Sequence, residues 1–289
     1  MGNIFKEIPN ERSSHKKTKL KSGGIFFILM VLISNLIYVL FKGSSEISQI
    51  IFICSLLSLI GLADDLFFLS SKIRYLIQII FSFFIVNAVH PFLLFDQNYI
   101  TLITLIFLGT VIINFMNFID GLDGILIGCS IPILIFSQIN FPNIQMITAI
   151  ASMIAFLKWN WDPSKIFMGD CGSNYLGGLI FFCILNKGEY LIDFKTIFII
   201  LPILLDCSWC IIRRFLNKEN IFIAHKKHLY QRLNQNGISH SNVSLIYIIL
   251  CLSNFFIALQ NNLNIFIFIS VLEILFLIYL DKSFAKKFI

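Results

Sequence analysis

Residues 25–41 read IFFILMVLISNLIYVLF, an apolar run without a single charged side chain. Further apolar runs follow along the chain, and their lengths approach the ~20 residues that cross a bilayer as a helix. Of the 289 residues, 57% are hydrophobic and only 13% are charged, whereas soluble domains are about 25% charged. The sequence therefore predicts an all-α, polytopic membrane protein, built as a transmembrane helical bundle.

About ten segments are expected to span the membrane. They are residues 25–41, 47–63, 73–90, 99–116, 125–140, 143–158, 174–186, 194–212, 243–259 and 263–280. This pattern indicates one domain over residues 1–289, with a cytoplasmic arm at 1–24, helices and loops over 25–280, and a cytoplasmic tail at 281–289. Residues 1–24 are polar and basic, so they do not resemble a signal peptide.

The distribution of basic residues indicates the orientation. Alternating the ten segments from a cytoplasmic N-terminus puts 19 of the 22 Lys and Arg residues inside, and leaves Lys42, Lys187 and Lys195 outside. Such a bias fits the positive-inside rule. The same assignment places the polar motifs at cytoplasmic helix ends, which predicts a catalytic cleft on the cytoplasmic face. Membrane lipid and topology account for the net charge of +6, so no nucleic-acid partner is expected.

The seven cysteines do not form a disulfide or zinc pattern along the sequence. Six of them lie in apolar runs, where cysteine behaves as a small hydrophobic residue. Cys207 and Cys210 have redox spacing, but they lie within a predicted membrane helix. We expect both to be packing residues.

Two acids, Asp64 and Asp65, end the second apolar segment in the sequence GLADD (61–65). Adjacent carboxylates at a membrane boundary repel each other and are costly to desolvate, unless a cation or a proton lies between them. The alternative is a solvated helix end. These two residues alone do not decide between the two interpretations.

A polar stretch, NFMNFIDGLDG (114–124), follows the fourth segment. Asn114, Asn117 and Asp120 are three residues apart, so a helix stacks them on one face. Asp120 and Asp123 each precede a glycine, which is typical of a turn. Amide and carboxylate oxygens are the ligands that Mg²⁺ prefers, although a plain polar helix end would also use them.

A glycine-rich stretch, FMGDCGSNYLG (167–177), opens the seventh predicted segment, at 174–186. Glycines at a helix N-terminus let backbone N–H groups face a phosphate, and Asp170 beside them suggests a bridging metal. The alternative is an ordinary N-cap made by Ser173 or Asp170.

Two basic stretches complete the set of motifs. The loop at 213–242 contains HKKHLYQR (225–232), and the N-terminal arm contains PNERSSHKK (9–17). Histidines and clustered cations bind pyrophosphate, but a basic loop beside a membrane also contacts anionic lipid. Asp206 and Glu273 lie within predicted spans and are functional candidates for that reason.

Taken together and in their order along the chain, from the Pro9 motif to the His225 motif, these stretches resemble those of the polyprenyl-phosphate N-acetylhexosamine-1-phosphate transferases of glycosyltransferase family 4. The form of the histidine motif resembles the branch that initiates O-antigen and capsule synthesis. The related phospho-N-acetylmuramoyl-pentapeptide transferases carry adjacent histidines there.

The resemblance implies roles for individual residues. Asp170 would bind Mg²⁺, or alternatively Mn²⁺, with help from Asn117. The residues implied in catalysis are Asp64, Asp65, Asp120, Asp123, His225 and His228. Those implied in substrate binding are Asn114, Asn117, Phe167 (stacked on uracil), Gly172, Ser173, Arg12, Lys17, Lys21 and Arg232.

The resemblance also implies a reaction and a place. The enzyme would transfer N-acetylhexosamine-1-phosphate from a UDP-sugar to undecaprenyl phosphate in the bacterial cytoplasmic membrane, releasing UMP; a homodimer is left open. The alternatives are the pentapeptide transferase of peptidoglycan synthesis, a lipid or polyprenol-linked transporter, and an inactive relative. Two departures bear on activity: family members usually carry one more span before the Pro9 motif, and Lys21 replaces a family arginine.

Overall fold

The computed structural model describes residues 6–7, 19–67, 69–95, 97–185, 191–221, 223, 225–260 and 262–288. Strands β1 (Lys6–Glu7) and β2 (Lys19–Leu20) form a short antiparallel pair. The helices are α1 (Gly24–Lys42), α2 (Glu46–Phe67), α3 (Ser71–Val89), α4 (Phe92–Phe95), α5 (Tyr99–Ile119), α6 (Ile125–Asn140), α7 (Ile144–Asn160), α8 (Gly169–Ile184), α9 (Phe194–Ile199), α10 (Leu201–Leu216), α11 (Leu229–Gln235), α12 (His240–Ala258) and α13 (Leu263–Ser283).

The described part of the chain is a helical bundle of membrane type. Six of its helices are long and apolar enough to cross a bilayer: α1, α2, α3, α5, α12 and α13. Helices α6 and α7 are also apolar but shorter. On α13, Ile267, Phe268 and Leu275 are exposed, and an apolar outer surface of this extent suits contact with lipid. The predicted polytopic helical fold is confirmed for the described residues, which are helical apart from the short β1–β2 pair and their connecting segments, while the number of ten spans stays a prediction.

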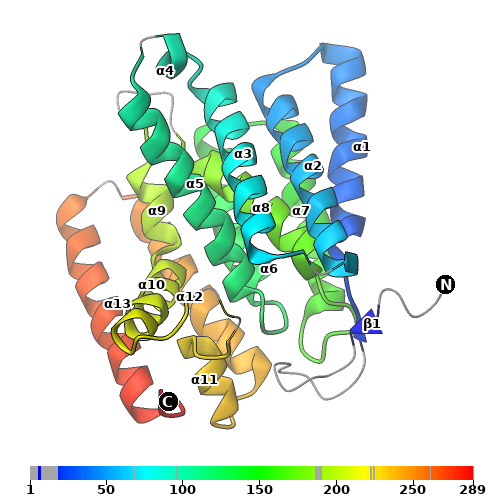
Figure 1. Cartoon of the computed structure of the whole chain (residues 1–289). Coiled ribbons are helices and arrows are strands. Elements are labelled where there is room, and N and C mark those ends of the chain that lie inside the picture. Colours follow the sequence, from blue (N-terminus) through cyan, green and yellow to red (C-terminus); the bar gives the residue numbers. More distant parts are fainter. Residues whose placement is uncertain are drawn as a thin grey trace.

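Helix α8 lies at the centre of the bundle and is almost wholly buried (Figure 1). Small residues allow its neighbours to approach closely, as in many membrane helix interfaces. A Cβ on Gly24 of α1 would lie 2.6 Å from Cα of Gly172, and one on Gly177 would lie 2.8 Å from Cα of Ile113 in α5. Gly61 of α2 packs in the same way against the backbone of Asp170.

Two predicted spans differ from the observed helices. The segment at 174–186 begins five residues earlier, because α8 includes the glycine-rich stretch from Gly169. The segment at 194–212 is divided into α9 and α10 at Ile200. Pro202 lies in the first turn of α10, where its missing N–H costs no helical hydrogen bond, so a new helix starts there readily.

The polar motifs meet at one end of the bundle, the lower end in Figure 1, where β1, α11 and the end of α13 also lie. Asp65 at the end of α2 contacts the start of α8, and Asn117 near the end of α5 reaches the same helix. Hydrogen bonds also join segments 120–124 and 162–164 and the start of α12 to one another. The fold thus gathers motifs that are spread over more than half of the chain.

Candidate active site

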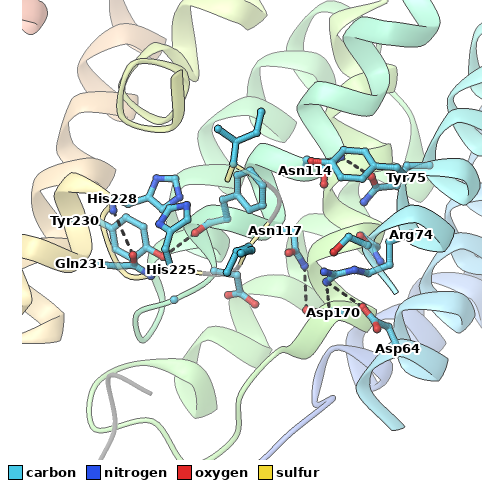
Figure 2. A pocket seen from close by; sticks show the side chains of 18 residues that line it. Asp64, Arg74, Tyr75, Asn114, Asn117, Asp170, His225, His228, Tyr230 and Gln231 are labelled. Atoms are coloured by element: carbon cyan, nitrogen blue, oxygen red, sulfur yellow. Dashed lines mark hydrogen bonds and ion pairs between the residues drawn. The ribbon is translucent and has the colours of Figure 1, made fainter. Parts of the chain in front are cut away.

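A polar cavity of ≈ 250 Å³ opens at this end of the bundle, between α3, α5, α8 and the loop that precedes α11 (Figure 2). Its lining comprises acids, amides, one arginine, two histidines and a few apolar side chains: Asp64, Ser71, Arg74, Tyr75, Gln78, Asn114, Asn117, Phe118, Asp120, Gly121, Asp170, Asn174, Ile221, Ile223, His225, His228, Tyr230 and Gln231. Figure 2 shows an acid side with Asp64 and Asp170, and a histidine side with His225 and His228.

The acid side is organised around Arg74. One guanidinium nitrogen, Nη1, lies 3.2 Å from Asp64 Oδ2 and 4.0 Å from Asp170 Oδ2. Asp64 also accepts a hydrogen bond from the backbone N–H of Leu69 (2.7 Å), which orients its carboxylate. The two acids therefore share a cation, because carboxylates this close to one another repel unless positive charge lies between them.

Asn117 connects this cluster to the interior of α8. Its amide nitrogen donates to Asp170 Oδ1 at 3.0 Å and to the hydroxyl of Ser173 at 2.9 Å. Ser173 is fully buried, so it supports Asn117 from behind, and the prediction that it contacts substrate is not supported by this position. Asn114 lies one turn earlier and donates to Gln78 of α3 and to the carbonyl of Thr110.

Asp65 points away from the cavity and toward the N-terminus of α8. Its carboxylate accepts the backbone N–H groups of Asp170 (3.1 Å) and Cys171 (3.4 Å) and the hydroxyl of Ser22 (2.7 Å), and it forms an ion pair with Lys21 (2.8 Å). These N–H groups are therefore already satisfied by a carboxylate. This corrects the expectation that they face a phosphate, and it places Lys21 beside Asp65 at the base of α8.

Gly172 and Phe167 also lie outside the residues that line the cavity. Gly172 packs against Gly24, so its role in the structure is close helix packing. The ammonium group of Lys19 lies 4.7 Å from the ring centroid of Phe167. The backbone N–H of Phe167 donates to the carbonyl of Leu20. Neither residue has the predicted contact with the cavity. Arg12 and Lys17 lie outside the described residues.

The two acids of the 114–124 stretch separate as well. Asp120 lines the cavity. Asp123 is buried behind it, where it accepts the backbone N–H of Ser164 (3.0 Å) and lies 3.3 Å from Lys19 Nζ and 3.4 Å from His240 Nδ1. Burial alone would raise the pKa of Asp123, but hydrogen bonding with His240 and Ser164 outweighs it and holds this pKa well below its ordinary value. Asp123 therefore lies behind the cavity and does not line it, and its predicted catalytic role stays a prediction.

Three aromatic rings stack on the histidine side. The rings of His225 and His228 lie 4.9 Å apart, and that of His228 lies 5.8 Å from Tyr230. The Tyr230 hydroxyl donates to the carbonyl of Phe118 at 2.7 Å, and Gly121 leaves room for that hydroxyl. Burial, followed by the nearby side chains of His228 and Arg214, lowers the pKa of His225 to about 3. His225 is therefore neutral at physiological pH.

Arg232, which was expected to bind substrate, instead fastens the C-terminal segment. It is buried and forms an ion pair with Asp281, and it donates to the carbonyls of Lys227 (3.1 Å) and Lys286 (2.8 Å). Asp281 also forms an ion pair with Arg213, whose Nη1 lies 2.7 Å from Asp281 Oδ2. A guanidinium whose hydrogen bonds are used in this way belongs to the scaffold of the site.

Some residues that line the cavity have no role predicted from the sequence. The sequence motifs place Arg74 among the basic residues at helix ends and assign no role to Gln78 or Asn174. A signal for the first two was present, because Arg74, Gln78 and Ser82 recur every four residues in the third apolar segment. This spacing gives a helix one polar face, and the structure turns that face inward, with Gln78 and Ser82 buried.

The donor set on the acid side fits a hard divalent cation. Carboxylate oxygens of Asp64 and Asp170 already converge on one cationic nitrogen. The buried Oδ1 atom of Asn174, another residue of the cavity, has no hydrogen-bond partner among the described residues. Carboxylate and amide oxygens are what Mg²⁺ and Mn²⁺ prefer, so the residues present are compatible with either ion.

The fold and the cavity define an integral membrane protein with a charge-lined cleft at one end of an apolar helical bundle. The family described as glycosyl transferase family 4 matches residues 47–187, which include Asp64, the 114–124 stretch and Asp170. A relative from Bacillus subtilis (strain 168), a probable undecaprenyl-phosphate N-acetylglucosaminyl 1-phosphate transferase, is 31% identical over 265 residues, or 83% of this chain and 73% of the relative. The chain belongs to glycosyl transferase family 4.

Two further relatives represent two activities. An undecaprenyl-phosphate alpha-N-acetylglucosaminyl 1-phosphate transferase of Thermotoga maritima is 28% identical over 229 residues, covering 78% of this chain and 72% of the relative. A phospho-N-acetylmuramoyl-pentapeptide-transferase of Dictyoglomus thermophilum is 33% identical over 216 residues, covering 67% of each. Both are similar to this chain over most of its length.

Proposed function

We propose that this protein transfers N-acetylhexosamine-1-phosphate from a UDP-sugar to undecaprenyl phosphate, with release of UMP. The names of the Bacillus and Thermotoga relatives support the class of reaction. The observation that carries the proposal is the cluster of Asp64, Arg74, Asn117 and Asp170, which lies in one cavity with two histidines at the end of an apolar bundle. A charged nucleotide-sugar and a membrane-bound phosphate can meet at such a place.

The proposed reaction is a single displacement. A phosphate oxygen of the lipid attacks the β-phosphorus of the UDP-sugar, the bond from that phosphorus to the bridging oxygen breaks, and UMP leaves with the electron pair. Asp64 and Asp170, together with Asn117, would hold Mg²⁺, which supplies positive charge to offset that on the pyrophosphate. Arg74 provides a further cation for the phosphates. His225 is neutral and lines the same cavity.

We place the cleft on the cytoplasmic side of the bacterial inner membrane. Lys19, Lys21, Lys72 and Arg74 all belong to the end of the bundle that carries the cavity. This accumulation agrees with the positive-inside rule, and UDP-sugars are cytosolic substrates. The variants Lys218→Cys, just after α10, and Ser44→Cys, between α1 and α2, test this orientation, because both positions are exposed. A membrane-impermeant thiol reagent applied to intact cells should label Ser44→Cys and leave Lys218→Cys unlabelled. The reverse pattern would contradict this orientation.

The glycan that the product enters is a narrower question. His225 and His228 are separated by two lysines, and this form favours the O-antigen or capsule branch over the enzymes with adjacent histidines. The second candidate is the pentapeptide transferase of peptidoglycan synthesis, which the Dictyoglomus relative supports. The two differ in whether the sugar carries a peptide, so substrate choice separates them.

The experiment is to measure UMP release by purified full-length protein in detergent, with undecaprenyl phosphate and a panel of UDP-sugars that includes UDP-N-acetylmuramoyl-pentapeptide. We expect release with one UDP-N-acetylhexosamine, loss of release in EDTA, and recovery on addition of Mg²⁺. Release with the pentapeptide substrate alone would assign the second candidate. Release with none, from folded protein, would contradict the proposed activity and favour an inactive relative or a transporter.

A further inference from the structure

A thiol lies behind the histidine side of the cavity. Cys210 of α10 is buried, and its sulfur and one nitrogen each of His225 and His228 all lie within 4.8 Å of one another. The sequence contains no zinc-type spacing of cysteine and histidine, because the thiol and the imidazoles come from different segments. The fold brings together three groups that each offer a soft or borderline ligand atom.

The donor set differs in kind from that of the acid side. One thiolate sulfur and two imidazole nitrogens suit Zn²⁺ and Co²⁺, whereas Mg²⁺ requires oxygen. Metal–ligand bonds of about 2.0–2.3 Å in a tetrahedral site hold the donor atoms roughly 3.5 Å apart. The three groups would therefore have to close by about 1 Å when the ion binds.

Asp206 supplies the second indication. Its Oδ1 lies 3.6 Å from His228 Nδ1, a buried atom with no hydrogen-bond partner among the described residues. Asp206 is itself fixed by the backbone N–H of Leu229 (2.7 Å) and the hydroxyl of Tyr247 (2.6 Å). A carboxylate that faces one imidazole nitrogen in this way orients the other toward a metal. Asp206 precedes Cys210 by one helical turn, so α10 supplies both groups.

The surrounding charges and anchors are compatible with a bound cation. The thiolate of Cys210 and the carboxylate of Asp206 would together offset the two charges of the ion. Arg214, the next turn of α10, already holds the loop by pairing with Glu219 (3.1 Å) and by donating to the carbonyl of Ile221 (3.2 Å). The loop is thus attached near the site before any ion binds.

We propose that Cys210, His225 and His228 bind one divalent ion of the Zn²⁺ class, with the fourth position open to the cavity. The thiol of Cys210 loses its proton when the metal–sulfur bond forms. The ion then ties the histidine loop to α10 and fixes both imidazoles at the wall of the cavity. This site is separate from the oxygen donors of Asp64 and Asp170.

The test uses Co²⁺ as a spectroscopic probe on full-length protein in detergent, stripped of metal, with excess Mg²⁺ and no UDP-sugar. We expect one Co²⁺ per chain, a thiolate-to-cobalt charge-transfer band in the near ultraviolet, and the visible bands of tetrahedral cobalt. Cys210→Ser should lose the charge-transfer band and weaken binding at least tenfold. Cys207→Ser is the matched control and should keep both, because the Cys207 sulfur instead contacts the carbonyl of Phe115.

The readout is independent of transferase activity, so it stands whether or not UMP is released. If Cys210→Ser does not fold, His225→Gln replaces it, since this half-buried loop residue should weaken Co²⁺ binding without loss of folding. Absence of a thiolate band in the wild type, a band that survives in Cys210→Ser, or unaltered affinity in His225→Gln would overturn the proposal.

Discussion

Asp64 and Asp65 are neighbours in the sequence, yet their carboxylates lie on different sides of the helix end. Asp64 faces Arg74 in the cavity, whereas Asp65 accepts the backbone N–H groups of Asp170 and Cys171 at the start of α8. Successive residues of a helix point about 100° apart, so a pair of acids can serve a site and its scaffold at the same time. Asp65 thereby fixes the backbone that carries Asp170.

The first prediction separates these two acids. Asp65→Asn should lower the stability of the protein by about 1–3 kcal/mol, because a buried ion pair with Lys21 and charge-assisted bonds to α8 are lost. Asp64→Asn should leave the melting temperature near that of the wild type and abolish most UMP release. Thermal unfolding and turnover are measured on both variants. Equal stability of the two would show that Asp65 does not support α8.

The second prediction concerns Gly121 and Tyr230. Gly121→Ala should reduce UMP release strongly, because the new methyl group would occupy the position of the Tyr230 hydroxyl and displace the histidine wall. Tyr230→Phe removes that hydroxyl and its bond to Phe118, at a cost of about 1 kcal/mol. The double variant should therefore recover much of the activity that Gly121→Ala loses. Additive losses in the double variant would contradict the proposed contact.

The third prediction follows from the neutral state of His225. Its pKa is about 3 in the folded protein and about 6.5 when unfolded. Between these values the unfolded chain binds more protons, so this contribution to stability is complete above about pH 6.5 and declines as the pH falls toward 3. Between about pH 7 and pH 5, the melting temperature of the wild type should fall further than that of His225→Gln. An equal loss in both proteins would contradict the lowered pKa.

Much of the architecture could be predicted from the sequence. Long apolar runs specify membrane helices whatever their partners are, and the pattern of basic residues is compatible with all polar motifs lying at one end of the bundle, as Asp65, Asn117 and Asp170 do. The division between α9 and α10 was missed because Pro202 sits inside an otherwise continuous apolar run. The hydrophobicity of a run indicates how long the apolar segment is, but it does not indicate that one helix ends and another begins within it.

The individual roles of polar residues were harder to predict. Asp120 and Asp123 occur in identical Asp-Gly contexts, but only Asp120 lines the cavity, because Asp123 is held by Ser164 and His240 from distant segments. Arg232 lies in the histidine motif, yet Asp281 near the end of the chain fixes it to the scaffold. Such roles depend on partners far away in the sequence, which local motifs do not specify.

The most direct test of the central claim is Mg²⁺-dependent UMP release by Asp170→Asn. The matched control is Asp193→Asn, which changes an acid that caps α9 beyond the other end of α8, about 24 Å away along that helix; asparagine caps a helix about as well as aspartate. We predict that Asp170→Asn loses at least 100-fold in UMP release while it folds normally, and that Asp193→Asn retains wild-type turnover. Substantial turnover by Asp170→Asn would contradict a metal-assisted transfer at this cluster.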